Sequence, residues 1–239
     1  MISNLHSGLN GTGGAINSPI ISLLLMNSVT AWHGKSFRNT MFEVITIEGI
    51  QYPNHSDAQR WYDQLQYLKI GLSYVKNFDL AIDGGAFVGA WTREMAKRFK
   101  KVVAFEPDPQ NFELLKRNTK EFDNVFLHNA ALGDQNTKIG LDGKVPCSRY
   151  IIPEGEIQML RLDSLNLAPT FVKFDLEGTE IFALRGAEQT LKAYKPVVQM
   201  EYKDRVWDRY NSGDPERLLK SWGWKFQEKA HVDRIYTWT

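Results

Sequence analysis

The sequence predicts an α/β fold in which helices cover both faces of a mostly parallel, seven-stranded sheet. Apolar runs typical of buried strands alternate with helical patterns between residues 80 and 201. A glycine-rich turn follows the first of these runs. The last two strand patterns, at residues 224–228 and 232–238, are separated only by a short turn, so they predict a C-terminal antiparallel hairpin.

The first strand, helix and second strand of this fold are expected between residues 80 and 106. A short apolar run at 80–82 ends at Asp83, and the turn after it holds three glycines within residues 84–89. Apolar residues then recur at 91, 95 and 99, which predicts a helix with one buried face. A second apolar run at 102–105 ends at Glu106. A strand, glycine-rich turn, helix and acid-tipped strand are typical of half of a nucleotide-binding unit.

The alternation continues beyond Glu106. Residues 125–127, 171–174 and 196–200 are the third, fourth and fifth predicted strands. Asp108 and Pro109 suit the cap and first position of a helix, and residues 214–222 predict another short helix. Residues 138–141 and 157–162 favour short edge strands. The stretch 142–156 between them contains two prolines and two glycines, so we expect a loop that could act as a lid.

Composition limits the location and the partners of the chain. With 29 basic and 28 acidic residues and no long basic run, nothing favours a nucleic-acid partner. Cys147 is the only cysteine, which excludes an intrachain disulfide and a cysteine-rich metal site, so we expect a reducing, cytoplasmic location. The apolar run at 19–26 is shorter than the ~20 residues that span a bilayer, so we expect no transmembrane segment.

The glycine-rich turn indicates which nucleotide binds. A dinucleotide site favours G-x-G-x-x-G, but residues 84–89 read G-G-A-F-V-G, and the Cβ of Ala86 argues against close approach of a pyrophosphate. From Asp83 the same residues read D-x-G-x-x-x-G, which resembles the first motif of class I S-adenosylmethionine-dependent methyltransferases. The carboxylate of Glu106 could accept two hydrogen bonds from a ribose diol. The alternative is a strand–helix turn whose glycines only relieve strain.

Several motifs together resemble the FkbM family of class I S-adenosylmethionine-dependent methyltransferases. They are D-G-G-A-F-V-G (83–89), A-F-E-P-D-P (104–109), N-A-A-L-G-D (129–134), R-L-D-S-L (161–165), K-F-D-L-E-G-T-E (173–180), L-R-G-A (184–187) and P-x-x-x-x-E (196–201). The resemblance covers roughly half the chain and implies a Rossmann-like class I methyltransferase fold. It implies S-adenosyl-L-methionine as cofactor and O-methylation of a hydroxyl on a sugar, a glycan or another small molecule.

The same resemblance divides the chain into three parts. Residues 76–239 correspond to the methyltransferase domain, and residues 41–75 form a strand and helix cap in front of it. Residues 1–40 match no motif, and their glycine-rich start predicts a flexible N-terminal appendage. The oligomeric state is left open.

By resemblance, the cofactor site lies at the ends of the first three predicted strands. Glu106 takes the ribose hydroxyls, the turn takes the amino-acid end of the donor, and Asn129 reads the adenine edge. The full set of cofactor-binding candidates is Asp83, Gly84, Gly85, Ala86, Gly89, Glu106, Pro107, Asn129 and Ala130. The alternatives are that Glu106 is a plain exposed acid, that Asn129 is only a turn residue and that Gly84 serves only the turn.

Catalysis requires a base near the acceptor hydroxyl, because a neutral alcohol is a poor nucleophile. The four candidates follow the fourth and fifth strands: Asp175 or Glu201 as base, with Lys173 and Glu177 beside them. Lys173 and Asp175 are two apart on a strand and therefore point the same way. The alternative is a structural ion pair of Lys173 with Asp175 or Glu201. The three acids would also suit Mg²⁺, but we expect no resident metal.

Three competing functions remain. Ala86 and the closing hairpin both weaken an NAD-dependent dehydrogenase or epimerase. A nucleic-acid amino methyltransferase would carry Asn/Asp-Pro-Pro-aromatic after the fourth strand, where this chain reads D-L-E-G from Asp175. A non-enzymatic module that binds the donor without turnover is the third, and nothing in the sequence argues for it. Within the methyltransferase interpretation, another acceptor class is a further alternative. Among the histidines, only His128 is expected near the sheet edge that carries the site, where it more simply ends a strand.

Overall fold

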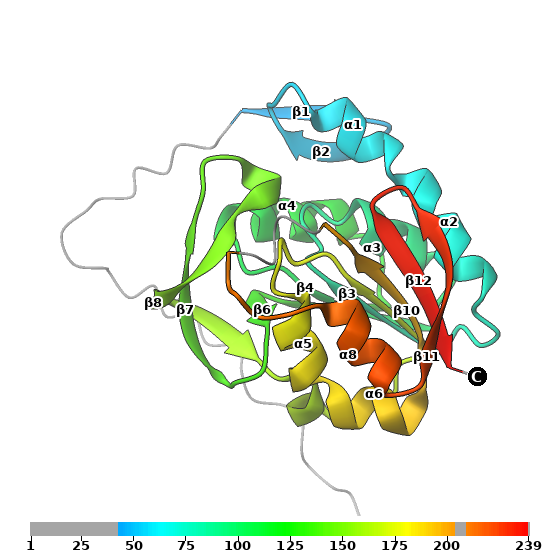
Figure 1. Cartoon of the computed structure of the whole chain (residues 1–239). Coiled ribbons are helices and arrows are strands. Elements are labelled where there is room, and N and C mark those ends of the chain that lie inside the picture. Colours follow the sequence, from blue (N-terminus) through cyan, green and yellow to red (C-terminus); the bar gives the residue numbers. More distant parts are fainter. Residues whose placement is uncertain (1–42, 204–208, 239) are drawn as a thin grey trace, which may run out of the picture. The chain divides into compact units, whose positions relative to one another are not determined.

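A computed structural model describes residues 43–203 and 209–238 of the chain (Figure 1). The predicted appendage at 1–40 lies outside the described residues, so the three-part division of the chain stays a prediction. No helix in the described ranges is long and apolar enough to cross a bilayer.

A seven-stranded sheet forms the centre of the described fold. From one edge to the other its strands are β11 (Trp224–Ala230), β12 (Asp233–Trp238), β10 (Val197–Glu201), β9 (Phe171–Phe174), β3 (Leu80–Gly84), β4 (Lys101–Phe105) and β5 (Val125–His128). The five strands from β10 to β5 are parallel, and β12 pairs antiparallel with both β10 and β11. The mostly parallel sheet and its C-terminal hairpin are therefore confirmed. The order reverses between β3 and β9, where open α/β sheets form ligand sites.

Helices cover both faces of this sheet (Figure 1). Their bounds are α2 (Leu65–Ser73), α3 (Ala90–Ala96), α4 (Pro109–Thr119), α5 (Glu180–Gly186), α6 (Glu188–Tyr194) and α8 (Pro215–Ser221). Successive strand residues point to opposite faces. Ala81 and Val102 accordingly pack against α2 and α3, whereas Ile82 and Val103 pack against α5, α6 and α8. Asp108 caps α4, with Pro109 in its first turn, as predicted.

The cap in front of β3 is a hairpin followed by two short helices. Strands β1 (Val44–Ile47) and β2 (Ile50–Pro53) pair antiparallel, and both turn residues, Glu48 and Gly49, have positive φ, as tight hairpin turns require. Helix α1 (Ala58–Asp63) leads directly into α2. The pattern of Ser56 and Gln59 predicts a capping box, but the helix is capped by Asp57 without any side-chain hydrogen bond.

A second, three-stranded sheet replaces most of the loop that the sequence predicts at 142–156. Its strands are β6 (Ala130–Leu132), β8 (Tyr150–Leu160) and β7 (Thr137–Asp142). The loop prediction was wrong from Tyr150 onward, because Ile151 and Ile157 on β8 pack with Ile139 and Leu141 on β7. Pro153 and Gly155 are tolerated because the pairing is irregular there: Ile139 pairs with Ile157, but the next residue, Gly140, pairs with Ile152. Only residues 143–149, with a 3₁₀ turn at Pro146–Ser148, connect the two strands.

Candidate active site

The carboxyl ends of the parallel strands open into one cavity of about 410 Å³. Its wall includes the cap, the glycine-rich turn, the strand ends, the second sheet with the connection between β7 and β8, and the turn between β11 and β12. Nine of the predicted site residues are in its wall: Gly85, Ala86, Glu106, Pro107, Ala130, Lys173, Asp175, Glu177 and Glu201. The other four predicted residues are not in it: Asp83, Gly84, Gly89 and Asn129.

The glycine-rich turn folds back onto the end of β4. Gly85 and Ala86 both donate their backbone N–H to the carbonyl oxygen of Phe105, at 3.0 and 2.9 Å. Gly85 has a φ of +74°, and a Cβ there would lie 1.9 Å from the backbone oxygen of Asp175. Glycine is therefore required at 85 by its positive φ and by the neighbouring end of β9. At Gly89 a Cβ would lie 2.5 Å from Leu115 of α4, so this glycine permits helix packing.

Glu106 is a buried carboxyl at the end of β4. One oxygen accepts the N–H of Phe87 at 2.8 Å and the other that of Asp108 at 2.9 Å. Burial raises the pKa of Glu106 to about 8. Each oxygen keeps a second lone pair, so the group can still bind a ligand hydroxyl from the cavity.

Asn129 lies behind this wall and contacts backbone. Its amide donates to the carbonyl oxygens of Glu106, at 2.8 Å, and Pro107, at 3.1 Å. The side chain thus holds the residues that face the cavity in place. His128, beside it, stacks on Phe105 with ring centroids 4.8 Å apart and does not line the cavity.

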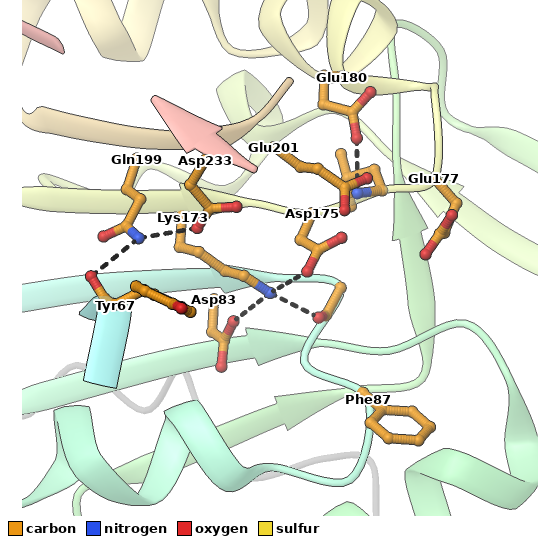
Figure 2. A network of polar contacts seen from close by, with 12 residues as sticks. Tyr67, Asp83, Phe87, Lys173, Asp175, Glu177, Glu180, Gln199, Glu201 and Asp233 are labelled. Atoms are coloured by element: carbon orange, nitrogen blue, oxygen red, sulfur yellow. Dashed lines mark hydrogen bonds and ion pairs between the residues drawn. The ribbon is translucent and has the colours of Figure 1, made fainter. Parts of the chain in front are cut away.

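Lys173 is a buried cation beside the glycine-rich turn (Figure 2). Its ammonium donates to the carbonyl oxygen of Gly85 at 3.0 Å and pairs with Asp175 at 3.5 Å and Asp83 at 3.7 Å. Asp83 in turn accepts the hydroxyl hydrogen of Thr92 at 2.6 Å. Burial lowers the pKa of Lys173, but the carboxylates of Asp175 and Asp83 outweigh it and the pKa is raised. Lys173 therefore stays charged and cannot accept a proton.

Three carboxyl groups converge at the ends of β9 and β10. One carboxylate oxygen from each of Asp175, Glu177 and Glu201 lies within 4.8 Å of the other two. Glu201 is buried and pairs with Lys203, whose ammonium also lies 3.9 Å from Glu177. Lys173 thus pairs with Asp175, as one of the predicted alternatives has it, whereas the partner of Glu201 is Lys203.

The two glutamates of this cluster are more buried than Asp175, and the pKa of each is raised. Burial raises the pKa of Glu177 to about 7, and burial together with the neighbouring carboxylates raises that of Glu201 well above its usual value. Asp175 is the most open, with 32% of its side chain exposed. Glu177 has a φ of +54°, a strained conformation for a residue with a side chain, and Gly178 follows it at +100°. The carboxylate of Glu180 accepts the N–H of Leu176 at 2.8 Å and thereby stabilises this loop.

Several cavity residues were missed by sequence reasoning. His231, in the turn between β11 and β12, lines the cavity and stacks on Tyr67 with centroids 4.9 Å apart. The expectation that only His128 lies near the site was therefore wrong. The predicted hairpin could have revealed it, because its turn returns to the edge where β10 ends: Glu201 pairs with Asp233.

The connection between β7 and β8 also reaches the cavity. Arg149 pairs with Asp108 at 2.7 Å, and Asn111 donates to the carbonyl oxygen of Pro146 at 2.9 Å. These contacts attach residues 146–149 to the start of α4, beside Glu106. Nothing in the local sequence indicates this contact, since it depends on how β8 pairs.

A comparison with protein-family models finds the Methyltransferase FkbM domain at residues 83–226. The chain belongs to the FkbM methyltransferase family. The match runs from β3 into β11 and so includes the glycine-rich turn, Glu106 and the carboxylate cluster. No curated protein matches the sequence significantly.

Several solved structures that are similar to this FkbM chain are described as methyltransferases. An FkbM methyltransferase from Methylobacillus flagellatus KT shares 22% identity over 67% of this chain and 43% of its own, with a TM-score of 0.49. The chain thus spans less than half of that longer protein. The N-methyltransferase NodS from Bradyrhizobium japonicum WM9 shares 12% identity over 77% of this chain and 99% of its own, also at 0.49. A second NodS structure, in complex with S-adenosyl-L-homocysteine, gives 0.46, with 12% identity over 77% of this chain and 87% of its own.

Proposed function

We propose that this FkbM protein transfers the methyl group of S-adenosylmethionine to a hydroxyl of a sugar, a glycan or another small molecule. The observation that carries the proposal is that one cavity joins the acid-tipped end of β4 to a cluster of carboxyl groups at the ends of β9 and β10. The first part suits a nucleoside and the second suits the deprotonation of an alcohol.

The cavity fits the cofactor that the family implies. Its volume of about 410 Å³ is within the usual range for small-molecule sites. Glu106 would hold the ribose hydroxyls, Pro107 and Ala130 would face the adenine, and the backbone of Gly85 and Ala86 would face the amino-acid end. When bound, the cofactor supplies a methyl group on a sulfonium, which a nearby oxygen can attack in line.

Asp175 is the better candidate of the two predicted bases. It is the most open carboxyl of the cluster, and the ammonium of Lys173 lies 3.5 Å from one of its oxygens. Glu201 is buried and engaged with Lys203, which leaves it less free to reach an acceptor. The proton of the acceptor hydroxyl would move to a carboxylate oxygen of Asp175.

A metal-assisted mechanism is the second candidate, favoured by the convergence of three carboxyl groups. Oxygen ligands of this kind suit Mg²⁺. Lys203 argues against a metal ion, because its ammonium already lies beside Glu201 and Glu177. It neutralises negative charge that a bound metal cation would otherwise balance. We therefore propose a metal-independent reaction.

Two measurements on the full chain test the proposed function. Calorimetry should show binding of S-adenosylhomocysteine and none of NADH. Transfer of a labelled methyl group, screened against glycans, lipid-linked sugars and an RNA pool, should modify a saccharide and should be unaffected by EDTA. Binding of NADH in place of S-adenosylhomocysteine would contradict the methyltransferase assignment. Labelling of RNA alone would contradict the proposed acceptor class. Loss of activity in EDTA, with recovery in Mg²⁺, would favour the metal mechanism.

A further inference from the structure

Tyr52 is a buried phenol on the cap whose hydroxyl has no hydrogen-bond partner among the described residues. The residue is 0% exposed, yet it lines the cavity. Burying a hydroxyl without a partner is costly, so folded proteins rarely retain one without a reason. Burial also raises the pKa of Tyr52, so the phenol stays protonated and can donate a hydrogen bond.

The position of Tyr52 is fixed by its neighbour in β2. Asn118 of α4 accepts the N–H of Gln51 at 2.9 Å and donates to the carbonyl oxygen of Gln51 at 2.8 Å. The same amide donates to the carbonyl oxygen of Val88 at 2.8 Å. One buried side chain therefore joins β2 to the end of the glycine-rich turn, which sets Tyr52 beside that turn.

The aromatic contacts of Tyr52 lead to the same place. Its ring lies 6.4 Å from that of Trp61 on α1, and Trp61 makes an edge contact with Phe87 of the turn at 5.1 Å. Helix α1 adds Asp57 and Arg60 to the cavity wall. This side of the cavity thus offers a phenol, a carboxylate and a guanidinium, which complement a zwitterionic amino acid.

We propose that the hydroxyl of Tyr52 donates a hydrogen bond to the carboxylate of the amino-acid end of the methyl donor, so that the cap forms one wall of the donor site. This inference rests on the proposed function. The carboxylate cluster at the ends of β9 and β10 would repel an anion, whereas the side of the cavity beside the turn carries Arg60 and the unpaired phenol. Glu106 accepts the N–H of Phe87 in the turn, so a donor whose ribose contacts Glu106 would lie beside the turn and could extend its amino-acid end along it.

Two ligands that differ only in the amino-acid end test the assignment. S-adenosylhomocysteine carries that end, and 5′-methylthioadenosine is the same thioether nucleoside without it. In calorimetry on the full chain, Tyr52→Phe should weaken binding of S-adenosylhomocysteine about tenfold or more, the scale of a hydrogen bond to a charged group, and leave binding of 5′-methylthioadenosine unchanged. Tyr62→Phe, on the same cap but outside the cavity wall, is the matched control and should change neither.

The stability of the empty protein separates this role from a structural one. Tyr52→Phe removes a hydroxyl that has no described partner, so the melting temperature without ligand should stay the same or rise. A fall in that temperature, an equal loss of affinity for both ligands, or unchanged affinity for S-adenosylhomocysteine with a raised KM for the acceptor would each overturn the inference. If the wild-type chain binds neither ligand, the proposed function fails. If the wild-type chain binds both ligands and Tyr52→Phe binds them with the same affinities, only the inference about Tyr52 fails.

Discussion

The two ends of the cavity differ in how completely their charges are paired. Beside the glycine-rich turn, the buried ammonium of Lys173 is surrounded by the buried Asp83, the partly exposed Asp175 and the carbonyl oxygen of Gly85. At the ends of β9 and β10, Glu201 and Glu177 lie beside Lys203, and Asp175 pairs with Lys173. This cluster therefore has more carboxyl groups than cations. The paired end holds a loop in one shape, whereas the acidic end retains groups that can take up a proton near neutral pH.

The largest expected effect is the loss of the buried cation. Lys173→Met would leave the carboxylate of Asp83 buried without its ion partner and would release the carbonyl oxygen of Gly85. Removing one partner of a buried ion pair costs about 3–5 kcal/mol of folding free energy, so chemical denaturation should show a loss of that size. Lys203→Met is the comparison: its side chain is 38% exposed, and the loss should be clearly smaller. Equal losses of folding free energy would mean that the ion pairs at the two ends of the cavity contribute equally to stability, which would contradict this comparison.

A smaller effect concerns Glu106 and pH. Its pKa of about 8 in the empty cavity means that most of it is protonated at pH 6.5. If the ionised form accepts the ribose hydroxyls, the cofactor lowers this pKa, and affinity for S-adenosylhomocysteine rises with pH and levels off above about 8. Between pH 6.5 and 8.5 calorimetry should show a gain of about tenfold, with proton release on binding.

Glu106→Gln is the control for this pH dependence. The amide keeps the shape of the side chain and cannot titrate, so affinity should be lower and nearly constant over the same range. A wild-type affinity that falls with rising pH would contradict the assignment, since it would mean that the protonated carboxyl is the binding form.

The residues that the sequence could predict are those whose position follows from local patterns. Glu106 and Asp175 could be predicted as site residues because each directly follows an apolar run, and parallel strands bring their carboxyl ends to one edge of the sheet. The fold class and the hairpin follow from the same periodicity. Lys173 was expected to pair with a nearby carboxylate, because a lysine in a central strand needs one.

The residues that were missed depend on contacts between distant segments. Tyr52 reaches the cavity only because Asn118 attaches β2 to the turn, and Arg149 only because β8 pairs with β7 where a loop was expected. Glu201 was assigned as a possible partner of Lys173, but the residue two positions later, Lys203, supplies its cation. Local patterns carry no information on such pairings.

The central claim is that the acidic end of the cavity, and Asp175 in particular, removes the proton of the acceptor. The most direct measurement compares methyl transfer and S-adenosylhomocysteine binding in Asp175→Asn and wild type, with Glu201→Gln alongside. We expect Asp175→Asn to bind the product as the wild type does and to transfer methyl groups 10²-fold or more slowly, the scale of a lost general base, with a smaller loss in Glu201→Gln. Full activity of Asp175→Asn with unchanged binding would contradict the claim and leave the cluster as a structural ion network.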